Sequence, residues 1–522
     1  MTPTMTPYRS QARPGRDGFL QLLGAEWTKF STVRGWWAGM ACAALAVVLV
    51  GLLGTAASPQ HGAANGPGIP TGPSGEPVND SFFFVHRTLT GNGSITVPVT
   101  SLTGVIDGQA GEYSGTQPWA KAGVILKESL SQGSPYAAVM VTPGHGVRMQ
   151  DDYTQDIAGL PGPVTAGAPR WLRLVRSGGT ITGYDSADGA HWTQVGTVKL
   201  TGLPSTVQVG MFATSPGYTV TQNSFGGGSF NSGPAQATGV FDHVDLAGGA
   251  PGSTWTGTAI GRGGPAAGGP GPGGGAVPFT RNAGRFTLTG SGDIAPVTPG
   301  PDGPFPTVTI EQSLTGAFLG LIAIVVVAAM FFSTEYRRGL IRTTLAATPR
   351  RGAVLAAKAV VIGAVAFVTG LVAAVVSIGV GVPKEENSGQ VLLTAPLLTE
   401  ARVIIGTAAM LAVAAIFAVA LGAILRRSAA AITIAVVIVV MPFLLTALNV
   451  VPAGIGVWLL RLTPAAGLAI EQSIPRYFQV TTVTSPVRGY YPLSPYAGFA
   501  VLCLWAAAAL ALALVMLRRR DA

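Results

Sequence analysis

Apolar residues are concentrated in two parts of the chain, the first tenth and the last two fifths. A helix needs about 20 consecutive apolar residues to cross the ~30 Å hydrocarbon core of a bilayer. Runs of roughly this length, with few charges, recur in both parts, and the pattern therefore predicts six transmembrane helices. They cover residues 36–55, 314–332, 353–380, 403–425, 429–450 and 496–517.

The chain before the first run has two different patterns. Residues 1–18 are rich in Pro, Arg and Thr without periodicity, which is typical of a disordered tail. Beyond them, Phe19, Leu23, Trp27 and Phe30 recur at three- and four-residue spacing, which indicates a helix lying in the membrane interface. Residues 19–56 are thus expected to form this helix and the first span. A cleavable signal peptide is not favoured, because the apolar run is longer than such a peptide needs.

Residues 57–313 have the pattern of a β-domain inserted between the first and second spans. Gly- and Pro-rich linker sequence begins the insert and recurs near Gly263. Short runs that alternate apolar and polar residues, with SADG at 186–189 as a turn signal, predict an all-β antiparallel sandwich of jelly-roll type over about 80–245 plus 284–290. The clearest runs are 122–126, 137–142, 171–176, 180–185 and 207–213.

Composition supports this division. Only 11% of the 522 residues are charged, which is low for a soluble protein. The net charge of +9 could indicate nucleic acid as a partner, but the basic residues flank the apolar runs. Membrane lipid is therefore the expected partner of these charges, and nucleic acid is not.

The arginines predict the orientation in the membrane. Four groups of them border the spans, and with six spans all four groups fall on one side, as the positive-inside rule requires. We therefore expect a multi-pass plasma-membrane protein with cytoplasmic N- and C-termini and an extracellular insert at 57–313. An outer loop would carry Glu385, Glu386 and Glu400. The arginine groups are 9, 13, 16 and 34; 337, 338, 342, 350 and 351; 426 and 427; and 518–520.

Two ionisable residues lie in or directly beside the predicted spans 353–380 and 403–425. Lys358 and Arg402 each lie within about two turns of a span end. Long basic side chains so placed can reach the headgroups, and we expect both to do so. The rest of the six spans shows no relay of ionisable residues, which argues against an ion-driven transporter.

The insert carries acidic residues but no pattern typical of a catalytic or metal site. A glycosidase would need two carboxylates at a working separation on one face. No strand alternation provides such a pair, so the carboxylates are expected to be solvated, and no catalytic residue is assigned. These are Glu112, Glu128, Asp151 and Asp152.

The histidines and tryptophans of the insert likewise do not indicate a particular ligand. All five histidines of the chain lie here without ligand spacing, so we expect surface positions and no metal or cofactor site. The tryptophans could stack on sugar rings, but core positions are expected. The histidines are 61, 86, 145, 191 and 243, and the tryptophans are 119, 171 and 192.

Several segments of the insert resemble a known fold family. WAKAGVILKES (119–129), SPYAAVMVTPGHGVRMQ (134–150) and VQVGMFATS (207–215) are similar to the concanavalin-like lectin/glucanase sandwich of bacterial extracellular proteins. The resemblance implies the sandwich fold. It also raises cell-wall glycan or an extracellular protein as a partner of the insert.

The membrane segments resemble the permease subunits of ABC-2-type exporters in their actinobacterial form. LLGAEWTKF (22–30), EYRRGLIRTTLAATPRRGAVLAAK (335–358), LGAILRRSAAAI (421–432) and the terminal LRRRDA carry this resemblance. It implies a homodimer or heterodimer of six-span permeases bound to two ABC ATPase subunits. In residues 314–522 it further implies a coupling segment at 333–358 and an external re-entrant segment within 452–494.

The resemblance also implies which residues meet the ATPase. The helix before the first span and the loop after the second form that contact in the family. Mapped onto this chain, the residues are Glu26, Trp27, Lys29, Glu335, Arg337, Arg338, Gly339, Arg342 and Pro349.

ATP hydrolysis itself is not expected in this chain. The phosphate-binding pattern GxxxxGK[ST] is absent from the sequence, which has no Gly-Lys pair. ATP and Mg would therefore bind a separate ATPase. The predicted function is the transmembrane permease subunit of an ATP-binding-cassette exporter, not an enzyme itself. The alternative is a membrane-anchored protein for extracellular glycan recognition, signalling or mechanotransmission.

Overall fold

The computed structural model describes most of the chain. The described residues are 18–57, 69–108, 111–165, 167–224, 227–249, 254–261, 279–297, 299, 307–337, 339–340, 350–387, 391–393, 395–480, 486 and 489–520. The expected disordered tail at 1–18 therefore lies outside the described residues, apart from Gly18.

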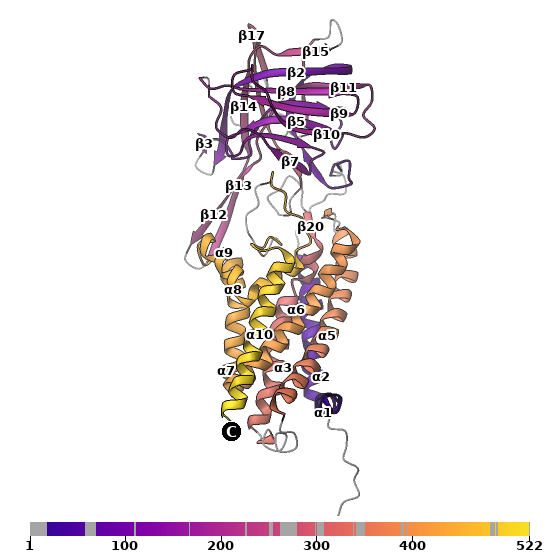
Figure 1. Cartoon of the computed structure of the whole chain (residues 1–522), viewed down its shortest axis with the longest axis vertical. Helices are drawn as coiled ribbons and strands as arrows, with labels where there is room; N and C mark the ends of the chain where they lie inside the picture. The colour runs from indigo at the N-terminus through magenta and orange to yellow at the C-terminus, as the bar shows by residue number, and fades with distance from the viewer. Residues whose placement is uncertain are drawn as a thin grey trace, which may run out of the picture.

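The molecule has two parts, a bundle of long helices and a β-domain inserted between its first two spans (Figure 1). Six helical stretches in the described part of the chain are long and apolar enough to cross a membrane, and they coincide with the six predicted spans. The helices are α1 (Phe19–Thr32), α2 (Arg34–Ala57), η2 (Ile310–Leu314), α3 (Ala317–Arg337), α5 (Arg351–Asn387), α6 (Leu397–Leu425), α7 (Ser428–Val439), α8 (Met441–Ala447), α9 (Ala453–Leu462), η3 (Pro464–Glu471) and α10 (Pro495–Arg520).

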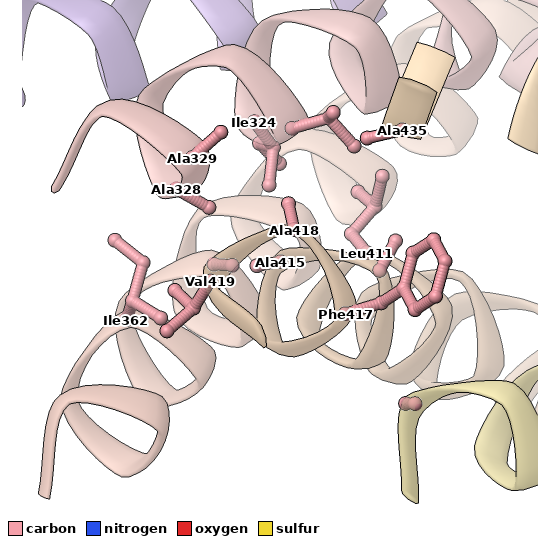
Figure 2. Close-up of a cluster of buried hydrophobic side chains, with 14 of the residues drawn as sticks. Ile324, Ala328, Ala329, Ile362, Leu411, Ala415, Phe417, Ala418, Val419 and Ala435 are labelled. Carbon is pink, nitrogen blue, oxygen red and sulfur yellow. The ribbon is translucent and has the colours of Figure 1, made fainter. Parts of the chain in front are cut away.

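Helix α6 lies at the centre of the bundle and packs against α3, α5, α7 and α10. Small residues at its contacts, such as Ala415 and Ala418, let the neighbouring helices approach closely (Figure 2). Ala328 points toward them from α3. Helix α2 packs on α3 and α5 at the edge of the bundle.

The β-domain is an antiparallel sandwich, as predicted. Every strand expected from alternation is present within one or two residues of its predicted bounds. Its strands are β1 (Val78–Asp80), β2 (Phe82–Gly108), β3 (Gly111–Ser114), β4 (Lys121–Lys127), β5 (Tyr136–Thr142), β6 (Gly146–Asp151), β7 (Gln155–Ala158), β8 (Arg170–Ser177), β9 (Thr180–Ser186), β10 (Thr193–Lys199), β11 (Thr206–Thr214), β12 (Tyr218–Ser224), β13 (Gly227–Gly233), β14 (Ala235–Phe241), β15 (Asp245–Gly249), β16 (Thr256–Ile260), β17 (Phe279–Asn282), β18 (Arg285–Ser291) and β19 (Ile294–Pro296). Two further strands, β20 (Thr307–Thr309) and β21 (Val391–Leu393), pair in parallel in a separate sheet.

Strand β2 organises the sandwich, and the sequence patterns did not single it out. Its first part pairs with β11 and β16, its middle with β8 and β15, and its end with β14 and β3. Gly91 has φ +73°, a conformation that glycine adopts easily, at the point where the pairing changes. One strand thus passes between layers, as at the corners of other sandwiches. Its apolar side chains, including Val85, Ile95 and Val97, enter the core.

Helix α5 is longer than the predicted third span. It continues through Pro383 to Asn387, so the acidic pair expected on an outer loop lies in its last turns. Glu385 is buried and accepts a hydrogen bond from Ser313 Oγ at 3.4 Å. Glu400 likewise lies in the first turn of α6 and not in a loop. The expectation failed because the polar residues at these helix ends resemble loop sequence.

A sharply bent helix pair lies in the range expected to be re-entrant. Helices α9 and η3 meet at Thr463 at an angle of 93°, and Pro464 begins η3. Proline cannot donate the backbone hydrogen bond that would continue α9. The pair is found at the end of the bundle that faces the β-domain (Figure 1).

Candidate functional site

Four charged side chains meet at the end of the bundle away from the β-domain. We call Glu26, Lys29, Glu335 and Lys358 the charge cluster. Lys358 Nζ lies 2.5 Å from Glu26 Oε2 and 2.6 Å from Glu335 Oε1. Lys29 Nζ lies 2.7 Å from Glu26 Oε1 and 3.2 Å from Glu335 Oε1. Two carboxylates and two ammonium groups thus balance in charge.

Three separate helices bring these side chains together. Glu26 and Lys29 lie on α1, Glu335 lies in the last turn of α3, and Lys358 lies in the second turn of α5. Glu26 faces the bundle because it shares a face with Phe30, which packs into the helical core. The cluster therefore links α1 to the end of α3 and the start of α5, the two helices that residues 338–349 connect in the chain.

Burial makes these ion pairs different from surface ones. Lys358 is completely buried and Glu26 is 2% exposed. A buried charge is tolerated only when it is paired, and removing one partner is strongly destabilising. Lys358 Nζ also lies 4.8 Å from the centroid of the Phe331 ring, which adds a cation–π contact.

Lys29 lies at the edge of the cluster and is partly exposed. Burial lowers the pKa of this lysine, but hydrogen bonds and charge from Glu26 and Glu335 outweigh burial and raise it above its ordinary value. Lys29 therefore keeps its charge at neutral pH.

The expectation that Lys358 reaches the headgroups is wrong. Its ammonium group stays inside the bundle and binds two carboxylates, one 23 and the other 332 residues away in the sequence. Spacing along α5 could not show this, because the partners come from α1 and α3. The sequence did contain a signal for this contact, because an ionisable residue inside a span usually pairs with another charged group.

Arg402 was also expected to reach the headgroups, and this is wrong as well. Its guanidinium is half-buried and donates to the backbone carbonyls of Ile470, at 3.1 Å, and Gln472, at 2.7 Å. It therefore joins α6 to the end of η3.

The remaining predicted coupling residues are placed differently. Trp27 is 47% exposed, and its ring lies 6.3 Å from the Trp37 ring of α2, between centroids. The chain turns at Gly339, whose φ of +69° ends the helical path of α3. Arg337 is the last residue of α3, and its side chain lies outside the described residues, as do Arg338, Arg342 and Pro349. Whether these residues meet an ATPase stays a prediction.

Two expectations for polar residues of the β-domain are corrected by their burial. Asp151 is 9% exposed instead of solvated, and burial together with the charge of Asp152 raises its pKa to about 6. His86 is 8% exposed and lies between Gln208 Oε1 at 2.9 Å and Thr258 Oγ1 at 3.0 Å. Burial lowers the pKa of His86. Alternation of apolar residues does not reveal which polar side chains a second layer will cover.

The tryptophans of the β-domain divide between core and surface. Trp119 is buried as expected and stacks on His145 at 4.0 Å between ring centroids. Trp192 is half-buried beneath Arg173, whose guanidinium carbon lies 3.9 Å from the ring centroid. Beside Arg173 is an open depression of about 700 Å³, also lined by Asn92, Ser94, Thr96, Ser177 and Asp245. Recognition of a glycan or protein by the insert stays a prediction.

The described residues contain no group of histidine, cysteine or acidic side chains arranged to hold a metal ion.

Comparison with known proteins identifies the family. Residues 148–522 match the profile of the ABC-2 family transporter proteins, which is well over half of the chain. The chain therefore belongs to the ABC-2 transporter family and is a membrane component of that transporter class. The match begins inside the β-domain and continues through the last five spans. No curated protein sequence matches the chain.

Solved structures similar to part of the chain are distant. A glycoside hydrolase of family GH43 from Bacillus licheniformis is 16% identical over 30% of this chain, with a TM-score of 0.19, and the match spans 27% of that enzyme. A Saccharomyces cerevisiae protein of unknown function is 14% identical over 33% of this chain and 72% of its own, with a TM-score of 0.19. Scytalido-glutamic peptidase is 5% identical over 42% of this chain and all of its own, with a TM-score of 0.23.

Proposed function

We propose that this chain is the permease subunit of an ATP-driven exporter in the plasma membrane. A separate ATPase, with ATP and Mg bound to it, would supply the energy, and a second permease protomer would complete the transporter. Membership of the ABC-2 family and the six apolar helices support the permease role. The lack of a phosphate-binding loop in the sequence supports a separate ATPase.

The observation that carries this proposal is the charge cluster. Its ion pairs tie α1 to α3 and α5, next in the chain to the arginine-rich segment 337–351. A displacement applied to α1 or to the segment between α3 and α5 would therefore move these two helices as one body, because breaking the cluster would leave charges buried without partners. Such a rigid connection is what coupling to an ATPase requires.

The positions of Glu26 and Glu335 change the role that we propose for them at the contact with the ATPase. Because their carboxylates face Lys29 and Lys358, they would act by holding α1 in place and not by touching the ATPase. Direct contact would fall to the exposed Trp27, to Arg337 at the end of α3 and to the arginines that follow it, including Arg338.

Co-purification tests the proposal. The tagged chain, extracted in mild detergent from its native cells, should retain an ABC ATPase. Charge reversal at Arg337 and Arg338 should weaken that association about tenfold or more, because each arginine supplies an interfacial charge pair. Charge reversal at Arg518 and Arg519, an arginine pair at the same end of the bundle, is the matched control. Absence of any ATPase from the wild-type preparation would contradict the exporter function.

The alternative of a membrane-anchored recognition protein is less well supported. An anchor needs one or two spans, whereas the described part of this chain has six long apolar helices around a shared core. The family match also covers the helical bundle and is not confined to the insert.

A further inference from the structure

A short segment after η3 joins the helical bundle to the β-domain. We call residues 472–479 the strut. At its far end, Gln479 Nε2 donates a 2.6 Å hydrogen bond to the backbone oxygen of Tyr153, in the turn between β6 and β7. Gln479 is 1% exposed, so this bond is shielded from water. A buried hydrogen bond of this kind is costly to leave unmade.

An aromatic contact stands beside that hydrogen bond. The ring of Phe478 lies 5.6 Å from Trp119 and 5.5 Å from His145, between ring centroids. The guanidinium carbon of Arg148 lies 4.8 Å from the Phe478 centroid, in a cation–π contact. Phe478 nevertheless remains 62% exposed, so it rests against the surface of the β-domain and is not part of its core.

The turn that receives Gln479 is firmly held within the β-domain. The side chain of Tyr153 is completely buried, and its hydroxyl donates to Asp80 Oδ2 at 2.8 Å. Lys127 Nζ, also completely buried, lies 2.8 Å from the same oxygen. A force on the Tyr153 backbone therefore acts on the whole domain.

The near end of the strut is fixed to the bundle by a second set of contacts. The backbone oxygen of Gln472 accepts from Arg402 of α6 at 2.7 Å. Ser473 Oγ donates to Glu311 of η2, the turn that precedes α3. Gln472 Oε1 accepts from the backbone nitrogen of Tyr491 at 3.3 Å. Both Gln472 and Ser473 are buried.

We propose that the strut transmits displacement from the helical bundle to the β-domain. On the bundle side it acts on the ends of α3 and α6 that face the β-domain. Only a few residues separate its two anchored ends, so it cannot absorb a large movement of either part. The β-domain would then follow the bundle through its transport cycle. Conversely, a partner bound to the β-domain would bias the bundle, because coupling between two sites is reciprocal. That an ATPase causes the displacement rests on the proposed function, whereas the connection between the bundle and the β-domain through the strut does not.

Distances between two spin labels test the tie in the full chain without nucleotide. Labels at Ala187→Cys, exposed between β9 and β10, and at Leu398→Cys, exposed at the start of α6, would be placed in a Cys42→Ala, Cys503→Ala background. The unmodified strut should give one narrow distance distribution. Gln479→Met keeps the side-chain length but removes the donor, and with Phe478→Ala it should broaden the distribution about twofold or more. Gln194→Met, on the surface of β10, is the matched control.

Two outcomes would contradict the proposal that the strut transmits displacement. One is an equally narrow distribution in the Gln479→Met/Phe478→Ala protein. The other is equal broadening in the Gln194→Met control. The single Phe478→Ala variant, which changes only an exposed side chain, keeps the test valid if the double variant does not fold.

A second measurement separates the strut from the proposed function. In the complex with its ATPase, Mg-ATP should shift the label distance, and the strut variants should lose the shift. If the wild-type complex shows no shift although the variants broaden without nucleotide, the proposed function fails and the tie stands.

Discussion

Lys358 shows how a single residue can decide the arrangement of several helices. Its ammonium group is completely buried and touches the carboxylates of Glu26 and Glu335. Without it, those carboxylates would share only Lys29, and the cluster would carry a net negative charge within the bundle. The cost of such an unpaired buried charge is several kcal/mol.

Replacement of this lysine should therefore destabilise the protein strongly. Lys358→Met removes the charge but keeps the length of the side chain, and we expect a loss of about 3–5 kcal/mol. The measurement is the midpoint of thermal unfolding in detergent, with the exposed Lys384→Met as the control. Adding Glu335→Gln should restore part of the loss, because Glu26 and Lys29 then balance. Equal midpoints for Lys358→Met and Lys384→Met would show that the ion pairs do not stabilise the bundle.

The close approach of α2 to the start of α3 is decided by glycines. A Cβ atom at Gly51 would lie 2.2 Å from the backbone oxygen of Ser313, and one at Gly316 would lie 2.0 Å from that of Val47. Neither backbone atom can rotate away as a side chain can. The two helices thus pack at a distance that only glycine permits.

Two glycines of the same helix allow a matched test of this packing. Gly51→Ala should destabilise the bundle by about 1–3 kcal/mol, because the added methyl group must push α2 away from Ser313. Gly54→Ala, one turn later, meets nothing within 4 Å and should be neutral or stabilise by up to about 1 kcal/mol. Thermal unfolding of both variants decides the matter, and a Gly51→Ala protein as stable as Gly54→Ala would contradict the packing argument.

At the scale of the whole molecule, the two parts lie at opposite ends of a long axis. Helix α1 and the C-terminal end of α10 lie at the end of the bundle away from the β-domain (Figure 1). The charge cluster occupies that same end, and the strut occupies the other. The proposed contact with the ATPase and the proposed contact with the cell exterior are thus separated by the length of the helices.

Labelling of single cysteines in intact cells should verify the proposed orientation. In the Cys42→Ala, Cys503→Ala background, Ala187→Cys in the β-domain should react with a membrane-impermeant maleimide. Thr28→Cys, exposed on α1, should react only after the cells are made permeable. We expect this difference because the four arginine groups favour the cytoplasmic side. Labelling of Thr28→Cys in intact cells would show that the orientation is opposite to the proposed one.

Much of this architecture could be read from the sequence because it depends on local patterns. Hydrophobic length revealed the six spans, and alternation at 122–126 and 207–213 revealed strands of the sandwich. The path of β2 could not be predicted in this way, because one strand that enters both layers has no simple alternation. The candidate site also depends on contacts between distant parts of the chain. Glu26, Lys29 and Glu335 were singled out through a family resemblance, whereas Lys358, the shared partner of the two glutamates, was not.

The sequence by itself thus determined what lies in the membrane, what lies in the insert and which charges border the spans, since each property belongs to a continuous stretch of residues. Only the tertiary structure decided which of those charges meet. Glu26 and Lys358 are 332 residues apart and become neighbours because α1 folds back onto α5. Tyr153 and Gln479, which are 326 residues apart, meet because the β-domain stands directly on the bundle. Such contacts depend on packing between distant elements, which no local pattern encodes.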